Sequence, residues 1–102
     1  MTKRVVIDET KVDYEKGIVR EEFIRRTDDT DTYPSGWKYR LHYGTLDGET
    51  IVRYDNSHGE HERHPPEEGE PIEFEGMEEL WKKFEKEVRK KRGERDARNR
   101  NR

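Results

Sequence analysis

The clearest alternation of apolar and polar positions lies between residues 37 and 43. Every second position there is aromatic or aliphatic, namely Trp37, Tyr39, Leu41 and Tyr43. The positions between them are basic, namely Lys38, Arg40 and His42. A period of two predicts a β-strand that buries one face. The Asp47-Gly48 pair suits a two-residue type I′ turn, so residues 50–55 are predicted to return as the second strand of a hairpin.

A second apolar pattern, with helical spacing, occupies residues 76–92. Its members recur at i, i+3, i+4, i+7 and i+11, namely Met77, Leu80, Trp81, Phe84 and Val88. This spacing predicts an amphipathic helix. Acidic residues at its start and basic residues at its end suit the helix dipole. Gly93 is a typical stop signal, and residues 93–102 hold little to bury, so we expect a disordered basic tail.

The rest of the chain predicts shorter strands and polar loops. Residues 4–8 indicate one strand, which Val12 and Tyr14 continue after a turn, and residues 18–25 indicate another. Ile72 and Phe74 suggest a short last strand. Strands followed by a helix favour an α+β fold, with a small antiparallel β-sheet of about four or five strands covered by one C-terminal α-helix. We expect one domain over residues 1–92, with the aromatic stripe packed on the helix rather than stacked on bases.

Composition narrows the function classes. Charged residues make up 46% of the 102-residue chain and hydrophobic residues 26%, which predicts a thin core. The absence of cysteine excludes disulfides, thiolate metal sites and cysteine nucleophiles. No apolar run is long enough to cross a membrane, and the residues before Val5 do not suit a signal peptide. We therefore expect a soluble, cytoplasmic protein with no membrane partner.

Charge is divided unevenly along the chain. Residues 1–81 carry 11 basic and 21 acidic side chains, whereas residues 82–102 carry 11 and 4. The basic C-terminal end could bind RNA phosphates by releasing counterions. The alternative is a solvated helix end that only aids solubility, and the acidic body restricts any RNA contact to this end.

The hairpin and the loop after it hold the residues with catalytic chemistry. These are Arg40, His42, Arg53, Tyr54, Asp55, Asn56, His58, His61 and His64. A period of two places arginine and imidazole groups on the face opposite the aromatic stripe. Imidazole and carboxylate groups can move the protons of phosphodiester cleavage, while arginine stabilises the charge on phosphorus, all without a metal. The alternative is a solvated sheet face beside a polar loop.

His58, His61 and His64 recur every third position, with Asp55 three residues earlier. This spacing raises a metal site as an alternative. However, Gly59 and the two prolines after His64 disfavour a helix that would bring the imidazoles together. The spacing also matches no standard zinc pattern. We therefore predict no metal ligand and no cofactor.

Three segments of the chain form a recognisable series, namely residues 39–43 (YRLHY), the RYDNxHG segment at 53–59 with its trailing histidines, and the strand–helix segment from Ile72. In these segments the chain resembles the TumE family of small prokaryotic toxins. The resemblance covers roughly residues 17–90 and implies the toxin of a toxin–antitoxin pair, with a helix-turn-helix antitoxin as partner. The chain departs from the family in the many glutamates at residues 60–70.

These observations lead to two functional hypotheses. The first is the toxin of a type II toxin–antitoxin system that acts as a metal-independent ribonuclease. Its predicted catalytic residues are His58, His61 and Asp55, and its predicted substrate-binding residues are Arg40, His42, Arg53, Tyr54 and Asn56. The second is a non-catalytic binding or regulatory module that acts through the acidic body and the basic C-terminal helix. In either case, an exposed strand edge could pair two copies into a homodimer.

Overall fold

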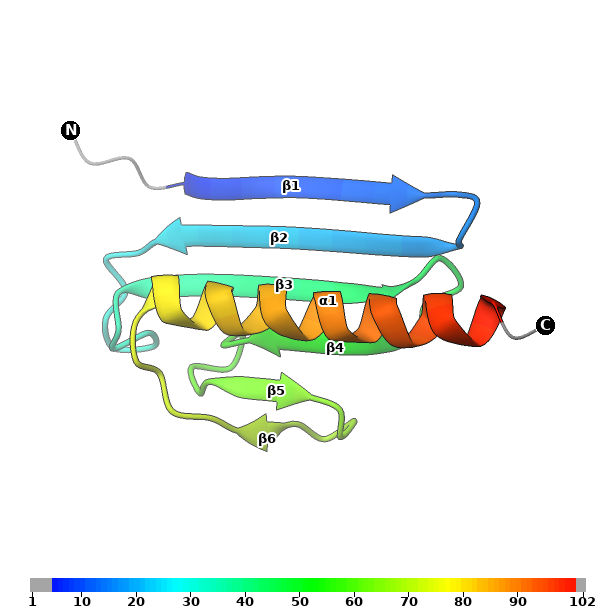
Figure 1. Cartoon of the computed structure of the whole chain (residues 1–102). Helices are drawn as coiled ribbons and strands as arrows, with labels where there is room; N and C mark the ends of the chain where they lie inside the picture. Colours follow the sequence, from blue (N-terminus) through cyan, green and yellow to red (C-terminus); the bar gives the residue numbers. More distant parts are fainter. Residues whose placement is uncertain (1–4, 101–102) are drawn as a thin grey trace.

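The fold is a six-stranded antiparallel sheet with one helix across it. The structure, a computed structural model, describes residues 5–100. The strands are β1 (Val5–Asp13), β2 (Ile18–Arg26), β3 (Trp37–Thr45), β4 (Thr50–Asp55), β5 (Glu62–His64) and β6 (Glu70–Pro71), and the helix is α1 (Met77–Arg100). The strands lie in chain order, and each pairs with the next (Figure 1). This architecture confirms the predicted α+β class, with slightly more strands than expected.

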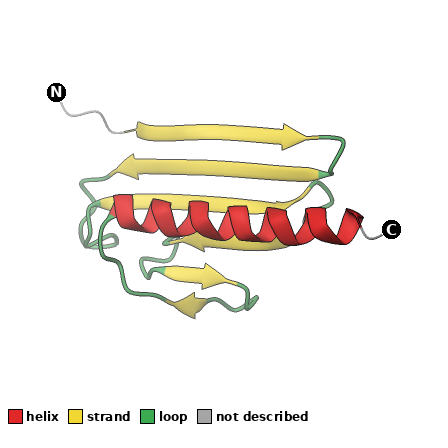
Figure 2. Ribbon diagram, viewed as in Figure 1, coloured by secondary structure: helices red, strands yellow, loops and turns green. Residues whose placement is uncertain are grey.

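The core lies between α1 and one face of the sheet. The predicted stripe supplies the buried side chains of Tyr39, Leu41 and Tyr43, and α1 covers them with Leu80, Phe84 and Val88. Figure 2 shows the single helix running along the sheet, over its central strands. The two apolar patterns of the sequence therefore meet as predicted. The opposite face of the sheet, called here the open face, has no helix among the described residues.

Ion pairs between α1 and the sheet supplement this thin core. Arg20 of β2 contacts the carboxylates of both Glu22 and Glu85. The indole Nε1 of Trp81 donates to Glu22 at 3.1 Å. Because Glu22 is 7% exposed, its pairing with these two donors avoids an uncompensated buried charge.

The N-terminal strand and the end of the helix differ from the prediction. β1 is continuous from Val5 to Asp13 with a bulge near Val6, rather than a strand, a turn and a second segment. The helix continues through Gly93 to Arg100, where the sequence predicted a disordered tail. Lys16, in the turn after β1, bonds Asp96 at 3.2 Å and ties this last part of the helix to the sheet. Residue 4 of the predicted first strand and residues 101–102 lie outside the described residues.

The segment predicted to be a polar loop contains β5 and β6. These short strands carry charged and polar side chains, so periodicity gave no sign of them. Ile72 and Phe74 follow β6 and pack against the core without forming the predicted strand. β5 therefore adds a third strand to the predicted hairpin, on the free side of β4.

Candidate functional site

Two rows of polar side chains cross β3, β4 and β5 on the open face. Residues that are directly opposite in a sheet share a face. The register pairs His42 with Arg53 and Arg53 with His64, which forms one row. It also pairs Arg40 with Asp55 and Asp55 with Glu62, which forms the second row. The sheet thus gathers six chemically active groups, whose sequence positions span more than twenty residues.

Asp55 lies at the centre of these contacts. Its Oδ2 accepts a hydrogen bond from Arg53 Nε at 2.8 Å, and its Oδ1 accepts one from the backbone N–H of Ser57 at 3.3 Å. His64 Nε2 lies 3.7 Å from Asp55 Oδ2. Because Asp55 is only 6% exposed, its charge depends on these partners.

The imidazole of His64 is held from both sides. Its Nδ1 lies 3.0 Å from the backbone carbonyl of Glu67, which can only accept, so Nδ1 carries the proton. Its Nε2 faces Asp55 and also Glu62, whose Oε2 lies at 3.5 Å. His64 is therefore fixed in place, with its Nε2 directed at two carboxylates of the open face.

These groups border a pocket of about 400 Å³ on the open face. The pocket combines cations, carboxylates and imidazoles, from Arg40, Arg53, Asp55, Ser57, His58, Glu62, His64, Glu67 and Glu68. A second hollow of about 620 Å³ shares Arg53, His64 and Glu67 with it and extends toward the β3–β4 turn. Glu67 and Glu68 are exposed at its rim, whereas Arg40 and Arg53 are partly buried beside the buried Asp55, so the two arginines are its anion-attracting groups.

His42 lies in the same row but is buried, with 7% of its surface exposed. Its Nδ1 has no hydrogen-bond partner among the described residues. Burial, reinforced by the charge of Arg40, lowers the pKa of His42. Gly44 makes room for the ring, because a Cβ there would lie 2.6 Å from His42 Nε2. His42 is therefore a neutral group beneath the open face.

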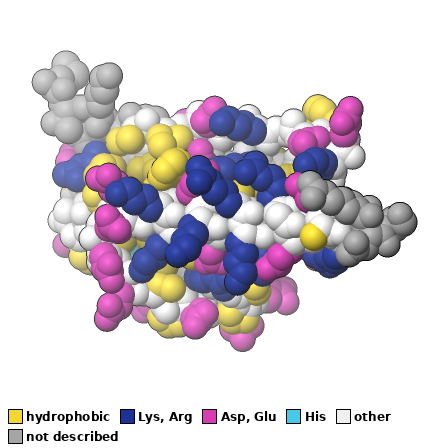
Figure 3. All heavy atoms as spheres, in the orientation of Figure 1, with side chains coloured by type: hydrophobic (Ala, Val, Ile, Leu, Met, Phe, Trp, Pro, Cys, Tyr) yellow, Lys and Arg dark blue, Asp and Glu magenta, His cyan; other side chains and the backbone are white. Residues whose placement is uncertain are grey.

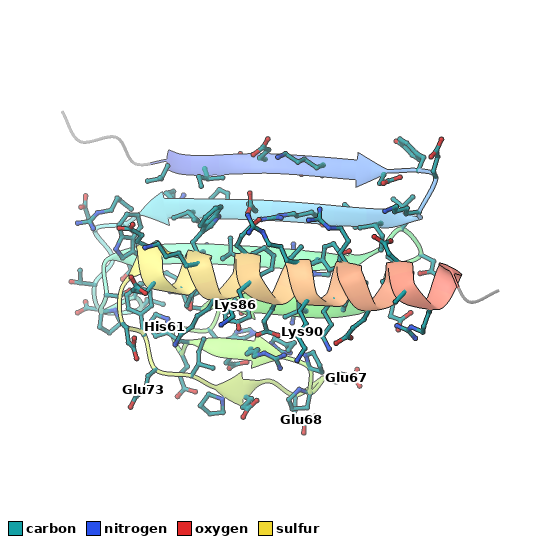
Figure 4. All side chains as sticks on the ribbon, viewed as in Figure 1. His61, Glu67, Glu68, Glu73, Lys86 and Lys90 are labelled. Carbon is teal, nitrogen blue, oxygen red and sulfur yellow. The ribbon has the colours of Figure 1, made fainter. Side chains whose placement is uncertain are left out.

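The structure places His61 on the core side of the sheet, away from His58. Its Nδ1 lies 2.7 Å from the Tyr39 hydroxyl, and its ring stacks on Phe74 with centroids 4.3 Å apart. Figure 4 shows His61 near the start of α1. Burial lowers the pKa of His61. The two histidines predicted to act together are therefore not brought together, and His64 occupies the position beside Asp55.

Tyr54 and Asn56, both predicted to bind substrate, belong to the framework. The Tyr54 hydroxyl contacts Glu87 on α1, and burial together with this carboxylate raises its pKa to about 12. Asn56 is 1% exposed and spans two backbone groups of β3. Its Oδ1 accepts from the Tyr39 N–H at 3.0 Å, and its Nδ2 donates to the Trp37 carbonyl at 2.7 Å. Neither side chain reaches the pocket.

The RYDNxHG segment therefore divides between the two faces, with Arg53, Asp55 and His58 in the pocket and Tyr54 and Asn56 inside. A family model described as Toxin TumE matches residues 2–92. The chain belongs to the TumE family. Membership supports a toxin role in a toxin–antitoxin system and, with it, an antitoxin partner. The comparison with curated proteins and the comparison with solved structures each gave no match.

Two kinds of feature are absent from the described part of this TumE chain. Within residues 5–100, no group of three or more His, Cys, Asp or Glu side chains has the geometry to hold a metal ion. The three histidines at residues 58, 61 and 64 do not converge. No described helix has the combined length and hydropathy to cross a membrane.

His64 is a pocket residue that the sequence grouped with the hairpin and its loop, and also with a possible metal site, but that was not among the predicted catalytic residues. The signal that could have placed it was the alternation of Glu62, Arg63 and His64. If that triplet is a strand, its first and third side chains share one face and the arginine takes the other. Arg63 does bind Glu87 on the core side, with its Nε 2.7 Å from Glu87 Oε1.

Proposed function

We propose that this TumE protein is the toxin of a prokaryotic type II system and acts in the cytoplasm as a metal-independent ribonuclease. The observation that carries the proposal is the convergence of two imidazoles, a carboxylate and two arginines on one pocket, namely His58, His64, Asp55, Arg40 and Arg53. This set can supply both proton transfers and the charge stabilisation that phosphodiester cleavage needs.

The proposed reaction uses the 2′-hydroxyl of the RNA as the nucleophile. The exposed imidazole of His58 takes the proton from this hydroxyl, whose oxygen then forms a bond to phosphorus. The bond from phosphorus to the 5′-oxygen breaks, and His64 Nε2 gives its proton to that oxygen. The products are a 2′,3′-cyclic phosphate and a free 5′-hydroxyl, so no metal or further reactant is required.

Arginine stabilises the phosphate in this scheme, and Asp55 positions the arginine. Arg53 is held by Asp55 through Nε, which leaves its other guanidinium nitrogens free to bind a phosphate oxygen. Arg40 Nη1 pairs with Glu21 at 3.2 Å on the same face. The glutamate rim repels the polyanion, so we expect one scissile phosphate to enter rather than a long RNA segment.

Controlled expression in a bacterial host tests this function. We expect wild-type protein to stop growth and cleave RNA, and the His58→Ala/His64→Ala variant to do neither. His61→Ala is the matched control, because His61 lies on the other face. Growth arrest with intact RNA would preserve the toxin role and contradict the ribonuclease.

A non-catalytic binding module is the second candidate, and the surface of α1 favours it. Lys83, Lys86 and Lys90 are exposed and form no ion pair among residues 5–100, whereas Lys82 pairs with Glu78 at 3.4 Å. Figure 3 shows basic side chains over the helix. Figure 4 shows Lys86 and Lys90 on the side of α1 nearer β5. Such a stripe suits an acidic protein segment, such as part of a helix-turn-helix antitoxin, or RNA.

Growth inhibition separates these candidates. If the module acts by binding, the Lys83→Ala/Lys86→Ala/Lys90→Ala variant loses inhibition and the His58→Ala/His64→Ala variant keeps it. The ribonuclease predicts the reverse order of effects.

A further inference from the structure

β1 is a long strand with one unpaired edge. It spans Val5–Asp13, pairs only with β2, and ends the sheet at the side opposite β6 (Figure 1). Long exposed edges promote pairing with another chain, and proteins usually shorten, cover or interrupt them. Here α1 packs against β3 and β4, so no element within residues 5–100 covers the outer edge of β1.

The exposed hydrophobic side chains gather on this strand. Four large ones are exposed among the described residues, and three of them are Val6, Val12 and Tyr14, at 53%, 40% and 82%. Tyr14 directly follows β1. None of the three belongs to the core cluster of the described residues, and exposed apolar side chains that gather on one surface mark a site that another chain covers.

We propose that two copies of this chain pair through antiparallel β1 strands, in a register centred on Thr10. In an antiparallel pair, two facing residues direct their backbone N–H and C=O groups either both toward the partner strand or both away from it. These directions alternate along β1, so a residue can face only a residue whose number is also even, or also odd. The two-fold axis then passes through one residue of β1, which meets itself. Choosing Thr10 as that residue pairs Ile7 through Asp13 of each copy.

The charges of β1 select this register from its neighbours. Centring on Thr10 places Glu9 of each copy opposite Lys11 of the second copy, which makes two attractive cross-strand pairs. Centring on Asp8, Glu9 or Lys11 would instead place that residue opposite the same residue of the second copy, so two like charges would face each other. Glu9 and Lys11 share one face of β1, as their intrachain contact of 3.7 Å shows, and both are exposed enough to change partners.

The same register also brings exposed groups together at its ends and at its centre. Val6 of one copy comes near Tyr14 of the second copy, the Thr10 hydroxyls meet at the axis, and Val12 faces Asp8. The axis is perpendicular to the sheet, so both helices stay on one face and both pockets open on the other. The pockets lie at β3–β5, away from β1, so dimerisation does not rest on the ribonuclease proposal.

Charge reversal on the full chain tests the register directly. Wild-type protein is expected to be a dimer by light scattering across a dilution series. Lys11→Glu and Glu9→Lys each create two like-charged pairs, and should raise the dimer dissociation constant about tenfold or more. An equal mixture of these two variants restores both attractive pairs, so a heterodimer should form, and the double variant should again form a homodimer.

Lys90→Glu, the same charge reversal on exposed α1, is the matched control and should remain dimeric. Three results would overturn the proposal: a monomeric wild type at every concentration, a single variant that dimerises as well as wild type, or a mixture that fails to recover the dimer. The mixture also shows whether the single variants are folded, because two misfolded variants would not form a heterodimer.

Discussion

Arg53 and Asp55 share the open face of β4, and Arg53 Nε donates to Asp55 Oδ2 at 2.8 Å. The Asp55 carboxylate is buried, whereas 28% of the Arg53 side chain is exposed. The carboxylate thus fixes the Nε side of Arg53, which lines the open-face pocket. In the proposed ribonuclease, this relationship makes Asp55 a positioning residue for phosphate binding.

Asp55→Asn should weaken both the fold and the site. The substitution removes the charge that faces Arg53 and His64 inside a buried setting, so we expect a loss of about 1–3 kcal/mol in the free energy of unfolding. Urea denaturation measures this change. Asp31→Asn, at an exposed position, is the control and should stay within about 0.5 kcal/mol of wild type. Equal effects of the two substitutions would argue against a central role for Asp55.

Two glycine-to-alanine substitutions should change stability in opposite directions. At Gly44, a Cβ would collide with the backbone carbonyl of Glu49 and crowd His42, so Gly44→Ala should destabilise by about 1–3 kcal/mol. At Gly93, a Cβ meets open space inside α1. Gly93→Ala should therefore stabilise by up to about 1 kcal/mol, because alanine favours the helix. Thermal unfolding of the Gly44→Ala and Gly93→Ala variants beside wild type measures these changes. Destabilisation by Gly93→Ala would contradict a helix that continues to Arg100.

Acid should weaken the contact between α1 and β2. Arg20 donates to Glu85 and holds the pKa of that carboxyl below its usual value, against a smaller effect of burial. A carboxyl whose pKa is lower in the folded state stabilises the protein above its unfolded pKa, near pH 4.3, and loses that contribution as pH falls through the folded value.

Denaturation between neutral and acidic pH checks this prediction. Glu85→Gln should be less stable than wild type at neutral pH, and the difference should shrink as the pH falls below about 4. Glu79→Gln, whose side chain is 57% exposed, should follow the wild-type profile at all pH values. A Glu85→Gln deficit that stays constant into acid would contradict the ion pair as its cause.

The sequence could predict the elements that bury apolar surface. The stripe from Trp37 to Tyr43 and the helical spacing from Met77 to Val88 each have one consistent period, and they form the two halves of the core. The turn at Asp47-Gly48 also lies where expected. It is not the predicted two-residue type I′ turn, because four residues separate β3 from β4 and only Gly48 among them has a positive φ. In the stripe and the helix, local pattern and tertiary packing agree.

The parts that could not be predicted depend on contacts between distant polar residues. β5 holds no apolar side chain, and its pairing with β4 decides which of three histidines joins Asp55. Without that pairing, His61 and His64 are equivalent in the sequence. The helical end beyond Gly93 depends likewise on Lys16, which is 80 residues from Asp96.

Cleavage of a defined RNA by purified protein in EDTA tests the central claim most directly. We expect wild-type protein to leave 2′,3′-cyclic phosphate ends, and His61→Ala to retain this activity. His58→Ala and His64→Ala should each reduce the rate by about a hundredfold or more, the usual contribution of a general acid or base. Wild-type rates in both of these variants, or complete loss of wild-type activity in EDTA, would contradict a metal-independent ribonuclease at the open-face pocket.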